Sequence, residues 1–159
     1  MECACGTGAI SKYTAPKCRY LTATDFSDKM LMQTDKKLRK YLNVLIEYAD
    51  ITKLDYANES FDKVVVGNVI HLLDDPYTAI DELLRVCKPG GKVIIPTYIN
   101  MSGGRQGFIV KLLEKSGAGF KRQFDIESYR AFFEKAGYKN VTYDVVRGRM
   151  PCVIAIIKK

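Results

Sequence analysis

Short apolar runs alternate along the chain with longer amphipathic stretches. Four runs are candidate strands, namely Tyr20–Thr24, Val44–Tyr48, Lys63–Val69 and Lys92–Thr97. Several of them are apolar at consecutive positions, which is expected when helices cover both faces of a sheet. The pattern therefore predicts parallel strands buried inside an α/β domain.

Two amphipathic stretches between these runs predict helices. One begins after Ser27, a favourable N-cap residue, and runs to about Leu42. The other has Pro76 in its first turn and runs to about Val86, where the Lys-Pro-Gly-Gly sequence at 88–91 stops it. Strands that alternate with helices in this way indicate a parallel α/β sheet.

The last third of the chain has a different pattern. After a glycine-containing loop we expect a short helix at Gln106–Lys115 and another at Ile126–Ala136, capped by Asp125. Two β-runs follow, Val141–Arg147 and Cys152–Lys158, and the short turn between them predicts an antiparallel pair. No repeat or linker marks a second domain, so residues 1–159 are expected to form a single domain.

The composition is that of a globular protein, 47% hydrophobic and 27% charged, and no apolar run approaches the about 20 residues of a membrane span. The net charge of +7 falls entirely within residues 98–159. Such an excess can attract anionic substrates, nucleic acid or lipid headgroups, which leaves peripheral membrane contact open. Because no dense Lys/Arg run occurs, a solvated surface is the simpler explanation of this excess. The oligomeric state is not indicated.

Five cysteines and one histidine limit the redox and metal chemistry. The cysteine number is odd, no Cys-x-x-Cys pair occurs, and His71 is the single histidine, so no metal site is expected. Reduced thiols in a cytoplasmic protein are the simplest interpretation. A redox or metalloid-thiol role for Cys3 and Cys5 is the alternative.

The first candidate binding feature is a loop of small residues. Ala4, Gly6 and Gly8 precede a predicted helix, and a loop of this kind lets the backbone approach a ligand. The helix start would add free N–H groups and a partial positive charge. An ordinary strand-to-helix turn would have the same composition.

Two carboxylates stand at the ends of the next two predicted strands. In nucleotide-binding α/β folds, a carboxylate at the end of this strand can hold ribose hydroxyls, and Asp25 has that position. Alternatively, Asp25 caps a helix together with Ser27. Asp50 is placed to accept a hydrogen bond from the adenine amine, with Ile51 packed on the ring. A turn aspartate that ends a strand is the alternative for Asp50.

Together these features resemble the class I S-adenosylmethionine-dependent methyltransferases, especially the ubiquinone/menaquinone-biosynthesis C-methyltransferase branch (the methyltransferase type 11 domain). The most specific match is Leu84–Lys92, with Cys87 where the family signature has leucine. The other matching segments are Glu2–Gly8, Ala23–Leu31, Ala49–Asp62 and Val65–Pro76.

The resemblance implies a Rossmann-like, doubly wound, mostly parallel seven-stranded sheet with an antiparallel C-terminal hairpin and a shortened first strand. Residues 1–97 would be the cofactor-binding half, and residues 98–159 the substrate-side half with the closing strands. It also implies S-adenosyl-L-methionine as cofactor and no metal. The implied contacts are Glu2, Ala4, Cys5, Gly6 and Gly8 at the methionine and ribose, Asp25 at the ribose hydroxyls, Phe26, Met30, Asp50 and Ile51 at the adenine, and Asn68 at the methionine end.

Two departures from the family pattern affect these assignments. Ala4 stands where the family has glycine, so we expect its backbone to keep a negative φ, as a Cβ prefers. The chain also begins within the first strand, whereas family members carry a preceding helical segment. We therefore expect an N-terminally truncated domain that is less stable and binds cofactor more weakly than an intact relative.

The implied reaction is methyl transfer to a small-molecule acceptor, which is quinone-like, aromatic or lipid-linked. Such a displacement requires positioning more than a dedicated catalytic residue. His71 is a candidate base, and packing is its alternative role. The candidates for the acceptor pocket, which alternatively serve packing and solvation, are Tyr98, Met101, Arg105, Phe108, Phe120 and Arg122.

Three other functions are compared with this one. A nicotinamide-dependent oxidoreductase would need Gly-x-Gly-x-x-Gly, whereas the loop reads Ala-Cys-Gly-Thr-Gly. A nucleic-acid amino-methyltransferase would carry Asn/Asp-Pro-Pro-Tyr/Phe where this chain has the sequence Asn68–His71, so nucleic acid is not the expected partner, although RNA methylation by another route stays open. The main alternative is a truncated remnant that is inactive or binds the cofactor without turnover.

Overall fold

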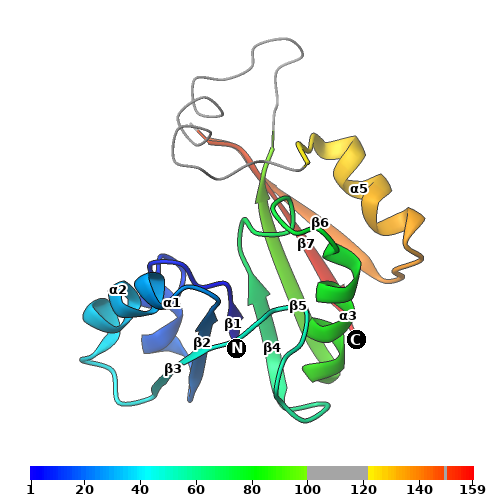
Figure 1. Cartoon of the computed structure of the whole chain (residues 1–159). Coiled ribbons are helices and arrows are strands. Elements are labelled where there is room, and N and C mark those ends of the chain that lie inside the picture. The colour runs from blue at the N-terminus through cyan, green and yellow to red at the C-terminus, as the bar shows by residue number, and fades with distance from the viewer. Residues whose placement is uncertain (100–121, 149) are drawn as a thin grey trace.

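A computed structural model describes residues 1–99, 122–148 and 150–159. Within these residues seven strands form one sheet in the order β3-β2-β1-β4-β5-β7-β6 (Figure 1). The strands are β1 Glu2–Cys3, β2 Leu21–Asp25, β3 Val44–Tyr48, β4 Phe61–Val66, β5 Cys87–Tyr98, β6 Val141–Val146 and β7 Cys152–Lys158. β1 to β5 are parallel, and β7 is antiparallel to both β5 and β6. The predicted fold class, with its short first strand, is confirmed.

The winding direction of the chain reverses at β1. The sheet grows from β1 through β2 to β3, and the chain then returns to the other side of β1 with β4 and β5. Right-handed crossovers place the connecting helices of the two halves on opposite faces of the sheet. The helices are α1 Ser11–Thr14, the 3-10 helix η1 Ala15–Lys17, α2 Asp28–Leu38, α3 Pro76–Val86 and α5 Ile126–Lys135. Ligands of such folds bind at the reversal point, beyond the carboxyl ends of the strands.

Two elements end three or more residues earlier than predicted. The helix that follows Ser27 ends at Leu38 instead of Leu42. Beyond its end, Asn43 fixes the connection to β3 by donating from Nδ2 to the carbonyls of Ala15 and Cys18, at 2.8 and 2.9 Å. β4 ends at Val66 instead of Val69, because Asn68 has a φ of 56°, which interrupts an extended strand.

The Lys-Pro-Gly-Gly sequence stops α3 as predicted but belongs to β5. The register against β4 shifts between the pairs Phe61–Cys87 and Lys63–Lys92, so the sequence forms a bulge in the strand. A Cβ at Gly91 would lie 2.7 Å from the carbonyl oxygen of Asp62. The second glycine is therefore required by the close approach of the two strands.

The predicted cap of the last helix is confirmed. Asp125 accepts a hydrogen bond from the Ser128 N–H at 2.8 Å and donates its own N–H to Ser128 Oγ at 3.0 Å, which forms a capping box. The sequence analysis missed a second cap, Asp75, which accepts from two N–H groups at the start of α3. The helix expected at Gln106–Lys115 lies outside the described residues. Among the helices described, none is both long and apolar enough to cross a membrane.

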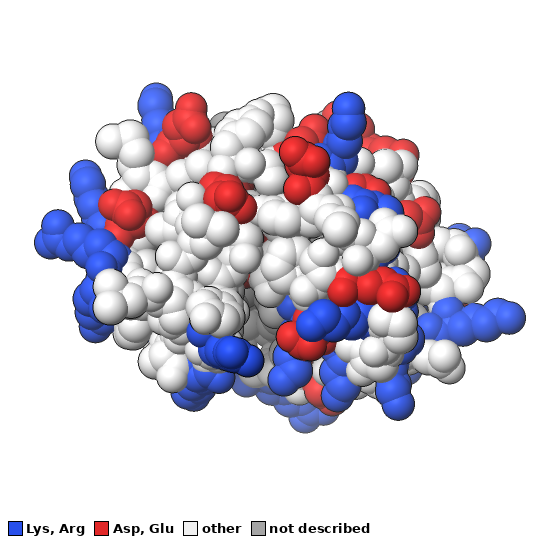
Figure 2. Space-filling model, turned by 90° about the horizontal axis from the view of Figure 1, so that it is seen from below, with Lys and Arg blue, Asp and Glu red and all other residues white. Residues whose placement is uncertain are grey.

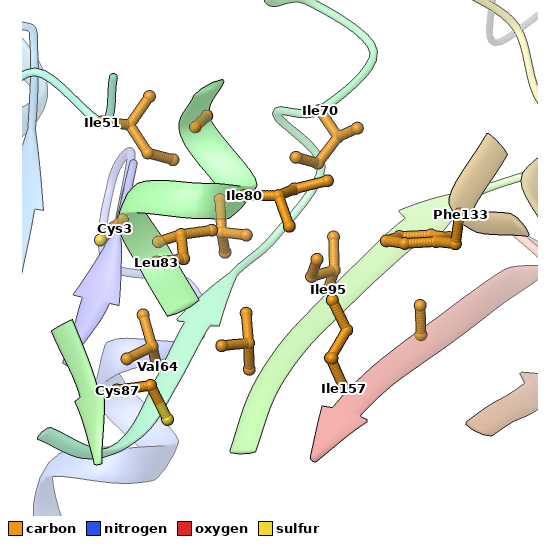
Figure 3. Packing of buried hydrophobic residues seen from close by; sticks show 14 of the residues in the cluster. Cys3, Ile51, Val64, Ile70, Ile80, Leu83, Cys87, Ile95, Phe133 and Ile157 are labelled. Carbon is orange, nitrogen blue, oxygen red and sulfur yellow. The ribbon is translucent and has the colours of Figure 1, made fainter. Parts of the chain in front are cut away.

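Two apolar clusters hold the helices on the sheet. In the larger one, Ile80 and Leu83 of α3 and Phe133 of α5 pack over Val64 and Ile95 of the central strands (Figure 3). The smaller cluster joins α2 and η1 to β2 and includes Leu38, Ala15, Leu21 and Ala23. Each large side chain that is fully buried in this way contributes about 1.5–3 kcal/mol, so the clusters fix the strand tips at which the site lies.

Figure 2 shows the molecule from below, at the end where the parallel strands begin. Lys and Arg side chains lie mainly around its outline, with Asp and Glu between them. One opposite-charge pair, Lys88 and Asp62, is 2.9 Å apart. This face therefore has mixed charge, which is typical of a solvated surface.

Candidate cofactor-binding site

The loop after β1 has an unusual backbone. Ala4, Gly6 and Gly8 all have positive φ, at 50°, 55° and 71°. The expectation of a negative φ at Ala4 was wrong, because the loop leaves β1 in a left-handed turn, in which Cys5 N–H reaches the carbonyl of Thr24 at 2.8 Å. A left-handed conformation costs a residue with a Cβ roughly 1–2 kcal/mol. The loop therefore carries strain at the position where the family has glycine.

Three N–H groups of the loop already have partners within the protein. Cys5 donates to Thr24 O, Gly6 to Asp25 Oδ2 and Gly8 to Cys5 O, all at 2.8–2.9 Å. The following helix, α1, has only four residues, so its dipole is weaker than that of a long helix. A Cβ at Gly6 would meet nothing within 4 Å, so the space beside its backbone is open to a ligand.

Asp25 joins the first two strand tips. Its Oδ2 accepts from Gly6 N–H at 2.8 Å and its Oδ1 from Ser27 N–H at 2.9 Å. An ionised carboxylate has about four acceptor positions, so two remain for the hydroxyls of a ribose. The carbonyl of Asp25 also accepts from Ala49 N–H at 3.2 Å, which brings the tip of β3 to the same place.

The predicted adenine side presents apolar side chains. Phe26 and Met30 are 66% and 37% exposed, and the Phe26 ring lies 5.2 Å from that of Tyr48, measured between centroids. The sequence analysis missed Tyr48, although its place before the Ala49-Asp50 pair was a signal. Ile51 is 9% exposed and belongs to the larger apolar cluster, and its expected contact with a ring stays a prediction.

Asp50 has the local bonding of a turn residue. Its Oδ1 accepts from both the N–H and the hydroxyl of Thr52, at 2.8 and 2.7 Å. The side chain is exposed, and its second oxygen remains available to a ligand amine. Both interpretations of Asp50 are therefore compatible with its geometry.

The tip of β4 approaches the loop from the other side. A Cβ at Gly67 would lie 2.6 Å from Ile10 Cδ1, so glycine allows the segment after the loop to pack on this tip. The next residue, Asn68, accepts the Tyr98 N–H on Oδ1 at 3.0 Å and donates its own N–H to Pro96 O at 2.8 Å. Asn68 thus ties β4 to β5 at the edge where the methionine end was predicted.

Glu2 is a buried carboxyl group below the loop. Its Oε2 accepts from Ser11 Oγ at 2.6 Å, and the residue is 3% exposed. Burial raises the pKa of Glu2 to about 7. The neighbouring thiols are also desolvated, and burial raises the pKa of Cys5 to about 11 and that of Cys3 to about 12. Both thiols are therefore protonated and poorly nucleophilic at neutral pH, and none of the five cysteines forms a disulfide.

The predicted base and acceptor-pocket residues are only partly described. His71 is 7% exposed, and burial lowers its pKa, which keeps the imidazole neutral at pH 7. Arg122 holds this turn, because its N–H donates to His71 O at 3.2 Å and its guanidinium to Leu73 O at 2.6 Å. Tyr98 is 45% exposed at the tip of β5. The four other pocket candidates lie outside the described residues, namely Met101, Arg105, Phe108 and Phe120.

Sequence reasoning missed two residues of α2 that contact the loop. Thr34 Oγ1 donates to Gly6 O at 2.8 Å, and Lys37 Nζ donates to Thr7 O. Thr34 lies three residues after Leu31 and four before Leu38, so it is a polar residue within the buried stripe of the helix. That break in the apolar pattern was the available signal.

A sheet of this order, with a small-residue loop after β1 and a carboxylate at the end of β2, defines a class I methyltransferase fold. The chain belongs to the methyltransferase domain family, whose profile matches residues 1–95. S-adenosylmethionine is the methyl donor of this family, so the predicted enzyme class and cofactor agree with the family to which the chain belongs.

The sequence is similar to two kinds of curated relative. It is 38% identical over 98 residues to a ubiquinone/menaquinone biosynthesis C-methyltransferase of Bdellovibrio bacteriovorus, a match that covers 60% of this chain and 42% of that protein. It is 29% identical over 164 residues to a demethylmenaquinone methyltransferase of Staphylococcus aureus, with 89% and 68% covered. The chain thus spans under half of the first relative and about two thirds of the second.

The fold is similar to that of a SAM-dependent methyltransferase from Aquifex aeolicus. The TM-score is 0.74 at 19% identity, and the match covers 98% of this chain and 80% of that one. The resemblance to the quinone-biosynthesis branch, stated from the sequence motifs, is confirmed at the level of family and fold. The roles of individual site residues stay predictions.

Proposed function

We propose that this chain transfers the methyl group of S-adenosylmethionine to a quinone-type aromatic acceptor. The observation that carries the proposal is the convergence of three strand tips on Asp25, which contacts Gly6 through its side chain and Ala49 through its carbonyl. The acceptor class is supported by the names of the two relatives, which refer to ubiquinone, menaquinone and demethylmenaquinone.

The residues of the site fit the cofactor in two respects. The space over Gly6 is open to a ligand, and the two remaining acceptor positions of Asp25 match a pair of vicinal hydroxyls. The exposed rings of Phe26 and Tyr48 add an apolar surface beside Asp50 for a flat base. The sulfonium supplies an already activated methyl group, so the protein has mainly to orient the donor and acceptor and exclude water.

A proton acceptor is needed if the acceptor loses a proton during methylation. His71 is neutral at pH 7 because burial lowers its pKa, and it lies on the turn after β4 at the same edge of the sheet. We assign it this role as part of the proposal. Arg122 would keep the turn in place through its hydrogen bonds to the backbone.

The test separates cofactor binding from turnover. The 159-residue chain is titrated with S-adenosylmethionine in a calorimeter and then incubated with methyl-labelled S-adenosylmethionine and a reduced, demethylated naphthoquinone with a short isoprenoid chain. We expect binding and labelled product. Binding without product would reject the proposed reaction and favour a domain that binds the cofactor without turnover, and absence of binding would reject both.

Asp25→Asn tests the central residue of the site. The substitution keeps the shape but removes the charge, and we expect the dissociation constant for S-adenosylmethionine to rise about tenfold or more, since hydrogen bonds to charged groups are the stronger ones. Asp35→Asn is the matched control, because Asp35 is an exposed carboxylate of α2. Equal affinities of the two variants would contradict the assignment of Asp25.

A further inference from the structure

Gly6 is held from two sides. Its N–H donates to Asp25 Oδ2, and its carbonyl accepts from Thr34 Oγ1, both at 2.8 Å. Asp25 and Thr34 come from β2 and α2, respectively 19 and 28 residues away along the chain. A glycine with positive φ has wide conformational freedom, so these two bonds select one backbone state of the loop.

Thr34 also determines the position of the next glycine. A Cβ at Gly8 would lie 3.1 Å from Thr34 Oγ1 and 3.2 Å from its Cγ2, so the loop rests directly on this side chain. Thr34 is completely buried, and no ligand could reach it through the loop without displacing Gly6 or Gly8. Its effect on any ligand is therefore transmitted by the backbone.

We propose that Thr34 is a positioning residue, whose hydroxyl holds the Gly6 carbonyl so that the loop keeps the shape that S-adenosylmethionine requires. The inference rests on the proposed function, because it concerns the same site. Lys37, one helical turn further along α2, donates to Thr7 O and supports the loop from the same side. Through these two residues α2 contributes to cofactor binding, a role that its amphipathic pattern does not predict.

The test compares three threonine variants. Thr34→Val removes the hydroxyl at nearly constant volume and leaves the Gly6 carbonyl with only the weak Cys5 thiol donor at 3.8 Å, whereas Thr34→Ser keeps the hydroxyl. Thr97→Val is the matched control, because Thr97 is also completely buried and donates its hydroxyl to Tyr129 at 3.3 Å, away from the loop. Affinity for S-adenosylmethionine is measured by calorimetry and stability by thermal melting.

We expect Thr34→Val to raise the dissociation constant about tenfold, since losing the hydroxyl partner of a partly buried acceptor has an effect of that order. Thr34→Ser should stay within about threefold of the unaltered chain. Thr97→Val should lower the melting temperature without changing the affinity. If Thr34→Val is destabilised but binds normally, or if Thr97→Val loses affinity equally, the inference is overturned.

Amide hydrogen exchange distinguishes failure of this inference from failure of the proposed function. Without any ligand, Thr34→Val should exchange the amides of Gly6 and Gly8 about tenfold faster than the unaltered chain, whereas Thr97→Val should leave them unchanged. If no variant and not even the unaltered chain binds S-adenosylmethionine, the proposed function is rejected. Unchanged exchange in Thr34→Val would then reject the role of Thr34 in holding the loop.

Discussion

Replacing Ala4 by glycine should distinguish the strained loop from an ordinary turn. Ala4 has a φ of 50°, whereas Ala15, at the end of α1, has a φ of −49°. The same substitution at the two positions therefore changes backbone strain at one and not at the other. Ala4 is half-buried against the larger apolar cluster, and Ala15 is fully buried in the smaller one.

Three effects determine the magnitude. Removing the Cβ relieves the left-handed strain at Ala4 only, by roughly 1–2 kcal/mol. Glycine costs about 0.5–1 kcal/mol of chain entropy at both positions. The lost methyl group costs up to about 0.8 kcal/mol where it is fully buried, as at Ala15, and about half of that at Ala4. Ala4→Gly should therefore be neutral or slightly stabilising, and Ala15→Gly destabilising, with a difference of about 2 kcal/mol.

The difference is measured by urea unfolding and by thermal melting of both variants. For a chain of this length, 2 kcal/mol corresponds to roughly 4–8 °C between their melting temperatures. The entropy cost of glycine is common to both variants and cancels in the comparison. If Ala4→Gly loses as much stability as Ala15→Gly, Ala4 does not adopt a positive φ, and the description of the loop is wrong.

Two further predictions concern titratable groups. Burial raises the pKa of Glu2 from an ordinary 4.5 to about 7, so the folded chain binds this proton more tightly than the unfolded chain does. The protonated carboxyl group therefore stabilises the fold by about 3 kcal/mol at most. This contribution is complete below pH 4.5 and is lost as the pH rises through 7. In Glu2→Gln the melting temperature should no longer fall between pH 4.5 and 7. If it falls as in the unaltered chain, other groups cause the pH dependence. His71→Gln should lower turnover about 100-fold without changing cofactor affinity. Unchanged turnover would leave His71 a packing role.

Local patterns were sufficient for much of the fold. The apolar runs located β2, β3 and β7 to within a residue, and Asp125, as a favourable N-cap residue, marked the start of α5. These elements are marked by residues only a few positions apart along the chain, so the local sequence is sufficient to predict them. Boundaries set by distant partners were predicted less well, as at Asn68, whose side chain binds the backbone of β5.

Some features of the candidate site were likewise predictable from local sequence, and others were not. The sequence by itself determined the order of motifs, the small-residue loop and the carboxylates at the strand tips, because each follows a strand whose pattern is local. Only the tertiary structure decided that Ala4 adopts a positive φ, that Gly6 is bound by Asp25 and Thr34, and that Glu2 is desolvated. The physical reason is that hydrogen bonding, burial and backbone strain depend on groups that folding brings together from distant parts of the chain.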